Sequence, residues 1–340
     1  MTTWLDEVVS GTERRLSAFF GEERARLEGL AVESSELVEA LESLTMRGGK
    51  RLRPAVLFAA FKAVEPAGRF EQVADACAAL ELLQTYLLVH DDWMDGDDER
   101  RGGPSVHASL GARHGDAHLG ASLAILAGDL ASAQSWRLLM SATDDPDRRA
   151  ALTAVALRMH EEVIVGQQLD VLAVEDVTRM QQLKTGSYTL RGPLALGAVL
   201  GDANEDQRAA LDAFGVPLGE AFQIRDDILG TFGDPGATGK PAGNDLRAGK
   251  RTSLVRAAEQ SGDDAALKAI RKVHGQADAK DADVAAAIAA LESCGAKASV
   301  LARLESLLVD ARAAIAGADF SDEGRAMLDA LAEKLAVRAT

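Results

Sequence analysis

Apolar residues recur every three to four positions along most of the chain, which is the spacing of amphipathic helices. Two such segments, residues 4–30 and 34–46, lead to the paired glycines Gly48 and Gly49. A third segment covers residues 50–64 and begins with basic side chains. The pattern therefore predicts two helices, a glycine turn, and a third helix whose N-terminus is positively charged.

The strongly apolar segment 70–94 predicts a long helix with acidic residues at its C-terminal end, followed by the charged stretch 96–104. Similar patterns predict further helices over residues 115–141, 147–173, 175–200, 205–232 and, in several pieces, 252–340. Residues 233–250 are rich in Gly, Pro, Asp and Lys and predict a long loop, which in a compact domain is usually functional. The spacing is that of an all-α helical bundle.

The composition agrees with helices and excludes some functions. A chain of 340 residues with 47% hydrophobic residues and only 8 Pro can bury a large helical core. The net charge of −16 argues against a nucleic-acid partner. The first residues lack the pattern of a signal peptide, and no apolar run has membrane-spanning length, so the cytoplasm is the expected location. Cys77 and Cys294 have no metal-binding spacing and are expected to be buried free thiols.

The acidic end of segment 70–94 is the first candidate site. Asp91 and Asp95 are one helical turn apart, and Asp92 lies beside them. A divalent cation would remove the repulsion between these carboxylates, and Mg²⁺ typically binds one or two carboxylates together with phosphate oxygens. The cluster alone could equally be a solvated acidic helix end.

Further carboxylates change that balance. Asp226 and Asp227 end another apolar helix, and Asp170 lies on an apolar helix that also contains Gly166. Two acidic pairs at helix ends suggest opposing walls of one cleft. Asp170 is either a metal ligand or a structural residue bonded to a neighbouring helix.

Basic residues cluster near the acidic ones. Lys50, Arg51 and Arg53 follow the paired glycines, and Arg100 and Arg101 precede another glycine pair. Such groups are charge-assisted donors for diphosphates. Together with Lys184, Thr185, Lys240 and Lys250, they suit two anionic substrates.

Five motifs, in order along the chain, resemble the trans-prenyl diphosphate synthase family, which includes the farnesyl and geranylgeranyl diphosphate synthases. They are GGKRLRP (48–54), DDWMDGDDERRG (91–102), GQQLD (166–170), KT (184–185) and QIRDDILGTFGDPGATGK (223–240). The resemblance implies one domain over residues 1–340, with a motif-bearing core at 48–250 and C-terminal helices at 251–340. The implied fold is an isoprenoid synthase bundle around a deep central cavity, and the implied assembly is a homodimer.

The resemblance also implies an activity. Isopentenyl diphosphate would be condensed with an allylic diphosphate (dimethylallyl, geranyl or farnesyl) through ionisation, alkylation and proton loss, with release of diphosphate. The implied cofactor is Mg²⁺, as a trinuclear cluster in which Mn²⁺ can substitute. The implied direct metal ligands are Asp91, Asp95, Asp170 and Asp226, with Asp92 and Asp227 as ligands or as partners of ligands.

The remaining implied roles fall into three groups. Isopentenyl diphosphate would be held by Lys50, Arg53, Gln84 and Arg101. The allylic diphosphate would be held by Arg100, Lys184 and Lys240. The dipoles facing the allylic cation would come from Thr185, Gln223 and the carbonyl of Lys184.

Product length depends on the pocket beneath Asp91. Tyr86 lies five residues earlier, roughly 7 Å deeper along the helix, where an aromatic ring can form the floor of a hydrocarbon pocket, and Leu87 follows it. This arrangement resembles the short-chain type that makes geranylgeranyl diphosphate, with farnesyl diphosphate as the alternative. Tyr86 could also be an ordinary core aromatic.

One position departs from the family pattern. The second motif usually reads DDxxD, but here its last position is Gly230, and Asp234 is a candidate replacement. This departure leaves open a catalytically silent subunit that regulates an active prenyl synthase. A class I terpene cyclase shares the fold, but it would have no use for an isopentenyl site at Lys50 and Arg53.

Overall fold

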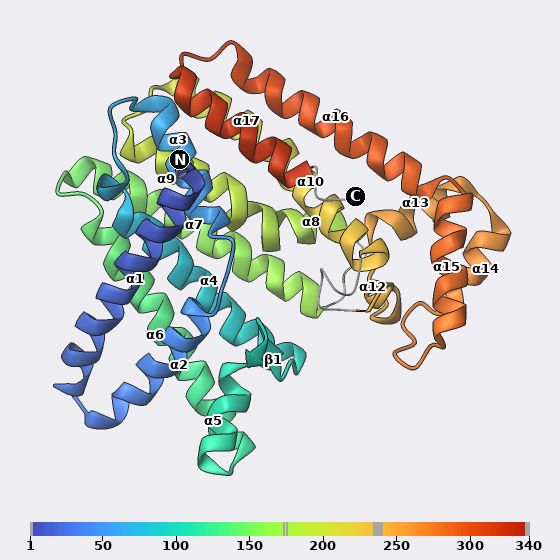
Figure 1. Ribbon diagram of the computed structural model, residues 1–340, viewed down its shortest axis with the longest axis horizontal. Coiled ribbons are helices and arrows are strands. Elements are labelled where there is room, and N and C mark those ends of the chain that lie inside the picture. Colours follow the sequence, from blue (N-terminus) through green and yellow to red (C-terminus); the bar gives the residue numbers. More distant parts are fainter. Residues whose placement is uncertain (1–2, 173, 175, 234–240, 337–340) are drawn as a thin grey trace. The chain divides into compact units, whose positions relative to one another are not determined.

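The computed structural model describes residues 3–172, 174, 176–233 and 241–336. Helices dominate these residues, and the strands among them are β1 (Glu99–Arg100) and β2 (Gly103–Pro104), which form a small antiparallel hairpin (Figure 1). The predicted all-α fold is therefore confirmed. The contacts within the chain divide it into two compact units: unit 1 is Met1–Leu157 with Pro193–Ala203, and unit 2 is Arg158–Gly192 with Asn204–Thr340.

Unit 1 contains the N-terminal helices. They are α1 (Trp4–Glu28), α2 (Ser35–Met46), α3 (Leu52–Val64), α4 (Ala74–Asp95), α5 (Val106–His114) and α6 (Ala117–Ser141), with short 3₁₀ turns at Val32–Ser34 and Phe70–Gln72. The predicted helices are confirmed here, and α5 is an addition that the pattern did not reveal. The third helix starts at Leu52 and not at Lys50, because Arg51 has left-handed backbone angles (φ 45°, ψ 42°).

The core of unit 1 is built around α4, which packs against α6, α3 and α1. Its leucines Leu80 and Leu82 are buried, as the apolar pattern requires. The rings of Phe58 and Phe70 meet edge to face with centroids 5.8 Å apart. Helix α4 ends at Gly96, whose φ of 69° is the left-handed conformation of a helix C-terminus. The acidic residues 91, 92 and 95 thus occupy the last turns of a rigid core helix.

Unit 2 is organised around α10 (Glu205–Phe232), whose predicted range is confirmed. It packs against α16 (Ala296–Ala316), and Ile224 and Ile228 of α10 share a buried apolar cluster with Val300 and Leu304 of α16. The other helices after the loop are α12 (Asn244–Arg247), α13 (Ser253–Ser261), α14 (Asp264–Arg271), α15 (Asp281–Ser293) and α17 (Asp322–Ala336). The predicted helices after residue 252 are therefore confirmed, whereas α12 lies within residues 233–250, where the sequence predicted only a loop.

The predicted helix over residues 175–200 is wrong in its middle. It divides into α8 (Val177–Gln181), the π-helical segment η3 (Gln182–Arg191) and α9 (Gly192–Leu200). Pro193 has no N–H, so the regular hydrogen-bond pattern cannot run through it. Segments of π-helix often occur at functional sites, and this one carries the KT motif.

Helix α7 (Pro146–Val171) confirms the predicted helix over 147–173. Among the described residues, no single helix has the length and apolar composition of a membrane span; only α15 and α16, bent by 58°, meet those criteria as a pair.

Candidate active site

The two adjacent aspartates at the end of α4 have different environments. The side chain of Asp92 is fully buried, and its Oδ1 accepts a 2.6 Å hydrogen bond from Nε of Arg100. Burial raises the pKa of the Asp92 carboxyl, and the Arg100 guanidinium opposes that rise. Asp91 is half-buried and Asp95 is exposed. Asp92 therefore anchors the β1–β2 hairpin to α4, while Asp91 and Asp95 remain accessible.

The aspartate pair on α10 repeats this arrangement. Asp227 is buried, with Oδ2 accepting from the backbone N (2.7 Å) and Oγ (2.8 Å) of Ser253. Its Oδ1 accepts from Nε2 of Gln223 at 3.1 Å. Burial raises the pKa of Asp227, and these hydrogen bonds oppose the rise. Asp226 is exposed. In both motifs the second aspartate is held by its own unit and the first is accessible to a ligand.

These carboxylates fit Mg²⁺. Among the described residues, no three His, Cys, Asp or Glu side chains converge on one point to form a complete protein cage. Mg²⁺ needs no such cage, since it keeps several waters and is typically held by one or two carboxylates and substrate phosphates. In addition, Oδ2 of Asp92 is buried and has no hydrogen-bond partner in the part of the chain that the structure describes. Such an oxygen is costly unless a cation or donor approaches it.

Asp170 and Lys184 form an ion pair in unit 2, with Nζ 2.5 Å from Oδ2. Gly166 makes this possible, because a Cβ at that position would lie 2.2 Å from the backbone N of Lys184. The glycine of the GQQLD motif thus lets α7 approach the π-helical segment closely. The structure therefore brings together two residues that the resemblance assigned to different roles, Asp170 to metal and Lys184 to diphosphate.

Gly230 has a steric explanation. A Cβ at position 230 would lie 2.0 Å from Oδ2 of Asp245, a residue of α12, whose carboxylate also pairs with Lys250 at 3.3 Å. The space beside the last position of the second motif is therefore occupied by a carboxylate from another helix. Asp234 and Lys240, by contrast, lie outside the described residues. The sequence pattern did not single out Asp245, because it lies on a different helix from Gly230.

The residues assigned to isopentenyl diphosphate all belong to unit 1. Lys50 is exposed, Arg53 is half-buried, and Gln84 is buried with no described hydrogen-bond partner for its Oε1. Arg101 has a left-handed backbone (φ 55°), and its Nη1 donates to the carbonyls of Leu44 (3.2 Å) and Gly48 (3.3 Å). Arg101 therefore connects the hairpin to the glycine turn that precedes α3.

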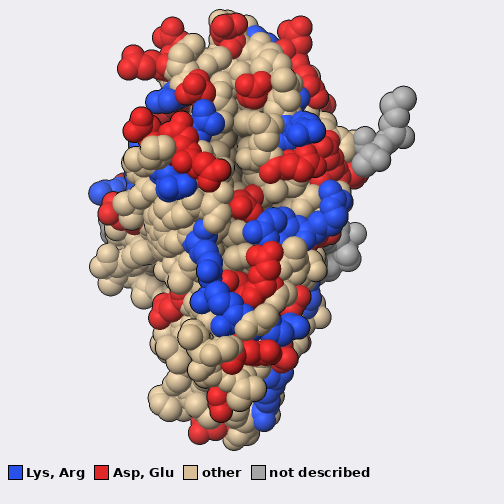
Figure 2. All heavy atoms as spheres, turned by 90° about the vertical axis from the view of Figure 1, so that its left-hand side faces the viewer, with Lys and Arg blue, Asp and Glu red and all other residues tan. Residues whose placement is uncertain are grey.

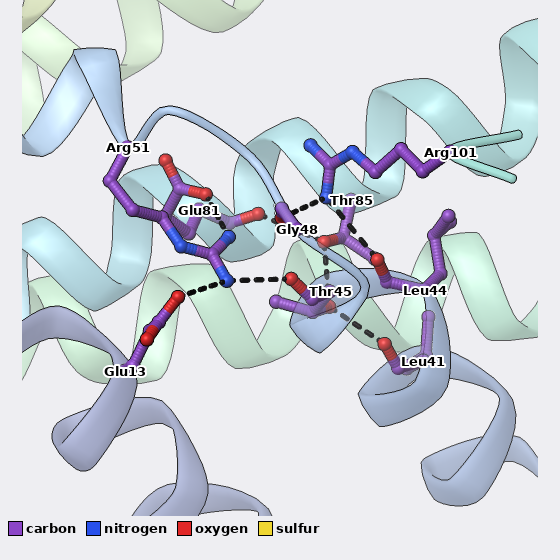
Figure 3. A network of polar contacts seen from close by, with 9 residues as sticks. All are labelled: Glu13, Leu41, Leu44, Thr45, Gly48, Arg51, Glu81, Thr85 and Arg101. Atoms are coloured by element: carbon purple, nitrogen blue, oxygen red, sulfur yellow. Dashed lines mark hydrogen bonds and ion pairs between the residues drawn. The ribbon is translucent and has the colours of Figure 1, made fainter. Parts of the chain in front are cut away.

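Arg51 does not belong with the exposed diphosphate donors, which corrects its grouping with Lys50 and Arg53. Its side chain is fully buried and donates to Glu81 at 2.6 Å and to the carbonyl of Thr45 at 3.0 Å (Figure 3). A left-handed backbone costs a non-glycine residue roughly 1–2 kcal/mol, so these contacts must hold it. Glu81 was also missed, although a carboxylate among the leucines of α4 was a usable signal.

Arg47 is a further residue that the sequence pattern did not reveal. It donates to the carbonyls of Pro104 (2.8 Å) and Arg100 (3.5 Å), and a Cβ on Gly103 would clash with it. It therefore fixes the hairpin from which Arg100 and Arg101 extend.

On the face drawn in Figure 2, Lys and Arg are interspersed with Asp and Glu, so the cationic groups act locally and not as one basic surface.

Tyr86 lies on α4 one turn before His90, and the two rings meet edge to face with centroids 4.9 Å apart. The His90 ring packs onto α6, where Nε2 is 3.1 Å from the carbonyl of Ile125. A Cβ on Gly128 would lie 2.2 Å from that nitrogen. Tyr86 is half-buried, and its ring packs against His90, which α6 in turn holds in place.

Unit 2 also has a pocket of about 410 Å³ along the face of α10 that carries Gln223 and Asp227. Of the residues assigned to the site, these two line it. Its lining arginines have partners, such as Arg303 with Glu220 at 2.8 Å and Arg256 with the Thr178 hydroxyl at 2.5 Å.

Comparison with known proteins identifies the family. Residues 34–291 match the family described as polyprenyl synthetase. The chain is 37% identical over 254 residues to the geranylgeranyl diphosphate synthase of Mycobacterium tuberculosis, covering 73% of this chain and 69% of that protein. It is 35% identical over 263 residues to the short chain isoprenyl diphosphate synthase of Methanocaldococcus jannaschii, covering 76% of each.

A solved structure is similar over nearly the whole chain. The geranylgeranyl pyrophosphate synthase of Corynebacterium glutamicum, solved with isoprenyl diphosphate and magnesium, superposes with a TM-score of 0.89 at 35% identity, covering 98% of this chain and 99% of that one. The chain belongs to the polyprenyl synthetase family, and it is a trans-prenyl diphosphate synthase. The resemblance drawn from the five motifs is confirmed.

Proposed function

We propose that this chain makes geranylgeranyl diphosphate by adding isopentenyl diphosphate to an allylic diphosphate. The observation that carries the proposal is the shared design of the two aspartate pairs. Asp92 and Asp227 are buried and held by neighbours in their own units, while Asp91 and Asp226 remain accessible. Each motif thus combines a buried carboxylate that is held in place with a neighbouring carboxylate that a ligand can reach.

The residues proposed to hold Mg²⁺ are Asp91, Asp95, Asp170 and Asp226, with Asp92 and Asp227 as their supports. Bound Mg²⁺ supplies Lewis-acid stabilisation of the diphosphate that leaves the allylic carbon. We take the full complement to be three ions, with Mn²⁺ as a substitute, because two acidic helix ends and one diphosphate offer several separate groups of oxygens.

The chain's own residues then hold the substrates. Arg100, Lys184 and Lys240 are proposed to bind the allylic diphosphate, so that negative charge developing on the leaving group meets fixed cations. Arg100 is paired with Asp92 and Lys184 with Asp170. A bound diphosphate would offer phosphate oxygens to both cations, Arg100 and Lys184.

Gln223 is oriented for the next step. Because its Nε2 donates to Asp227, the opposite end of the amide is a carbonyl oxygen with partial negative charge. With the Thr185 hydroxyl and the Lys184 carbonyl, it would stabilise the allylic cation while the double bond of isopentenyl diphosphate attacks. The double bond is the nucleophile, and the proton lost at the end would pass to the released diphosphate, so no protein base is required.

The proposed floor of the hydrocarbon pocket favours geranylgeranyl over farnesyl diphosphate as the product. The floor of the hydrocarbon pocket would be Tyr86, which is backed by His90, with the smaller Leu87 beside it. A single aromatic ring at this depth leaves room for a longer chain than two consecutive rings would.

The remaining proposals concern domain organisation, assembly and location. We infer that the two units work as one catalytic domain, that the chain forms a homodimer, and that it acts in the cytoplasm on its two diphosphate substrates. Light scattering of the purified protein tests the dimer.

Diphosphate release tests the activity. The purified protein is incubated with isopentenyl diphosphate and each of the three allylic primers, with Mg²⁺ and with excess EDTA. The proposal predicts release that depends on both substrates and stops with EDTA. No release with any primer would favour a silent regulatory subunit, and release from a primer alone would indicate a cyclase.

A further inference from the structure

The buried arginine of the GGKRLRP motif connects four segments of unit 1. Arg51 precedes α3, and its guanidinium reaches Glu81 of α4, the Thr45 carbonyl of α2 and, at 3.4 Å, Glu13 of α1 (Figure 3). Its side chain is fully buried and Glu81 is only 4% exposed. Neither residue can therefore touch a substrate from solvent.

The same network fixes the turn before Arg51. The Thr45 hydroxyl is 2.7 Å from that of Thr85, which joins the end of α2 to α4. Gly49 lies between the two guanidinium groups, since a Cβ there would be 3.3 Å from Nη1 of Arg51 and 3.6 Å from Cζ of Arg101. The turn is thus held on both sides, by Arg51 and by Arg101.

Several arginines lie close to one another around Arg101. Burial lowers the pKa of Arg101, and the neighbouring cations Arg51, Arg53 and Arg100 lower it further, while Glu81 opposes them. Glu81 is paired with Arg51 and Asp92 with Arg100, while Arg101 donates to the carbonyls of Leu44 and Gly48. The positive charge at this end of unit 1 therefore suits a doubly charged ligand such as a diphosphate.

We propose that Arg51 and Glu81 are positioning residues for isopentenyl diphosphate. Their buried pair holds the left-handed backbone at position 51 and thereby fixes the relative placement of Lys50 and Arg53, the cations on either side. This inference rests on the proposed function of those two residues. It separates the three basic residues of the motif into two that bind and one that holds them in place.

The pair should act on one substrate and not the other. If Glu81 is replaced, Arg51 loses its counter-charge, and the turn relaxes toward ordinary backbone angles. Lys50 and Arg53 then sample several orientations, which weakens the binding of isopentenyl diphosphate. The acidic end of α4 and the pairs that involve Lys184 are not part of this network, so the allylic substrate should be little affected.

The test compares steady-state kinetics of wild type, Glu81→Gln and Arg51→Lys, with each substrate varied in turn. The expected result is a KM for isopentenyl diphosphate raised about tenfold or more, with the allylic KM and kcat at saturation within about twofold of wild type. Arg51→Gly separates backbone from side chain: glycine adopts the left-handed conformation freely but leaves Glu81 without its counter-charge, so the isopentenyl KM should rise at least as much as in Arg51→Lys.

A matched control is another ion pair of unit 1, whose two side chains are partly buried. Arg15 of α1 pairs with Asp75 of α4 at 2.5 Å but lies outside the network, so Arg15→Lys should leave both KM values unchanged. If Glu81→Gln does not fold, Thr85→Val loosens the same turn without leaving a buried charge, and it should raise the isopentenyl KM by about threefold.

The outcomes separate the two proposals. Unchanged isopentenyl KM values in every soluble variant of this network would overturn the positioning role, as would equal rises in both KM values. An inactive wild-type protein would instead count against the proposed function itself.

Discussion

Oδ2 of Asp245 occupies the space that a side chain at Gly230 would need, since a Cβ there would lie only 2.0 Å away. The two positions belong to α10 and α12, which pack against each other. Position 230 is also one helical turn after Asp226. The second motif therefore lacks its last aspartate in sequence, while a carboxylate from α12 lies beside that position in space.

This relationship predicts that positions 230 and 245 are mutually exclusive for aspartate. Gly230→Asp alone should destabilise unit 2 by about 1–3 kcal/mol, because the new side chain overlaps the Asp245 carboxylate and repels it. The double variant Gly230→Asp with Asp245→Gly should regain most of that stability and retain activity. Thermal denaturation with a double-mutant cycle measures the coupling. Additive effects of the two substitutions would show that they do not share the space.

The accessible aspartates of the first motif and the buried Asp227 should respond differently to substitution. Asp91→Asn or Asp95→Asn should lower kcat by roughly a hundredfold with a near-normal melting temperature, because these carboxylates are accessible. Asp227→Asn should have the smaller effect on turnover but should lose about 1–3 kcal/mol of stability, because Asn replaces an acceptor of two bonds from Ser253. Comparable losses of kcat in all three variants would contradict this asymmetry.

Tyr86 should limit product length. Tyr86→Ala removes the ring that packs against His90 and should allow products longer than those of wild type. Tyr86→Phe keeps the ring and is the matched control, with unchanged products expected. Chromatography of the dephosphorylated alcohols gives the answer, and identical chain lengths in wild type and Tyr86→Ala would assign the ring to the core alone.

The acid stability of unit 1 should depend on Glu23. This buried carboxylate accepts from Arg26 (2.6 Å) and Arg137 (2.8 Å); burial raises its pKa, but these hydrogen bonds and charges lower it by more, so the net pKa lies below the usual 4.5. The unfolded chain therefore binds the proton more readily, and stability falls as the pH drops through the folded-state pKa. Melting temperatures between about pH 5 and about pH 3 should decline less steeply for Glu23→Gln than for wild type. Parallel curves would mean that another group controls the acid transition.

Much of the fold followed from the sequence because apolar periodicity is a local signal. The long helices α1, α4, α6 and α10 have clear periods and end at glycines or polar residues. The π-helical segment at Lys184 could not be predicted in this way, because apolar periodicity over so short a stretch does not distinguish a π-helix from an α-helix.

The candidate site was likewise only partly predictable from the sequence. The motifs identified which residues carry charge, but they did not show that Arg51 is buried, that Arg100 is paired with Asp92, or that Asp245 fills the space at Gly230. Each of these facts depends on contacts between residues that are distant in sequence or on different helices. Periodicity and motif spacing do not predict such contacts.

The most direct test of the account is the chain length of the product. Purified protein is incubated with Mg²⁺, labelled isopentenyl diphosphate and farnesyl diphosphate or a shorter primer, and the dephosphorylated products are separated by chromatography. The account predicts geranylgeraniol as the main alcohol from every primer that is accepted. Farnesol as the final product from the shorter primers, with farnesyl diphosphate not extended, would contradict it.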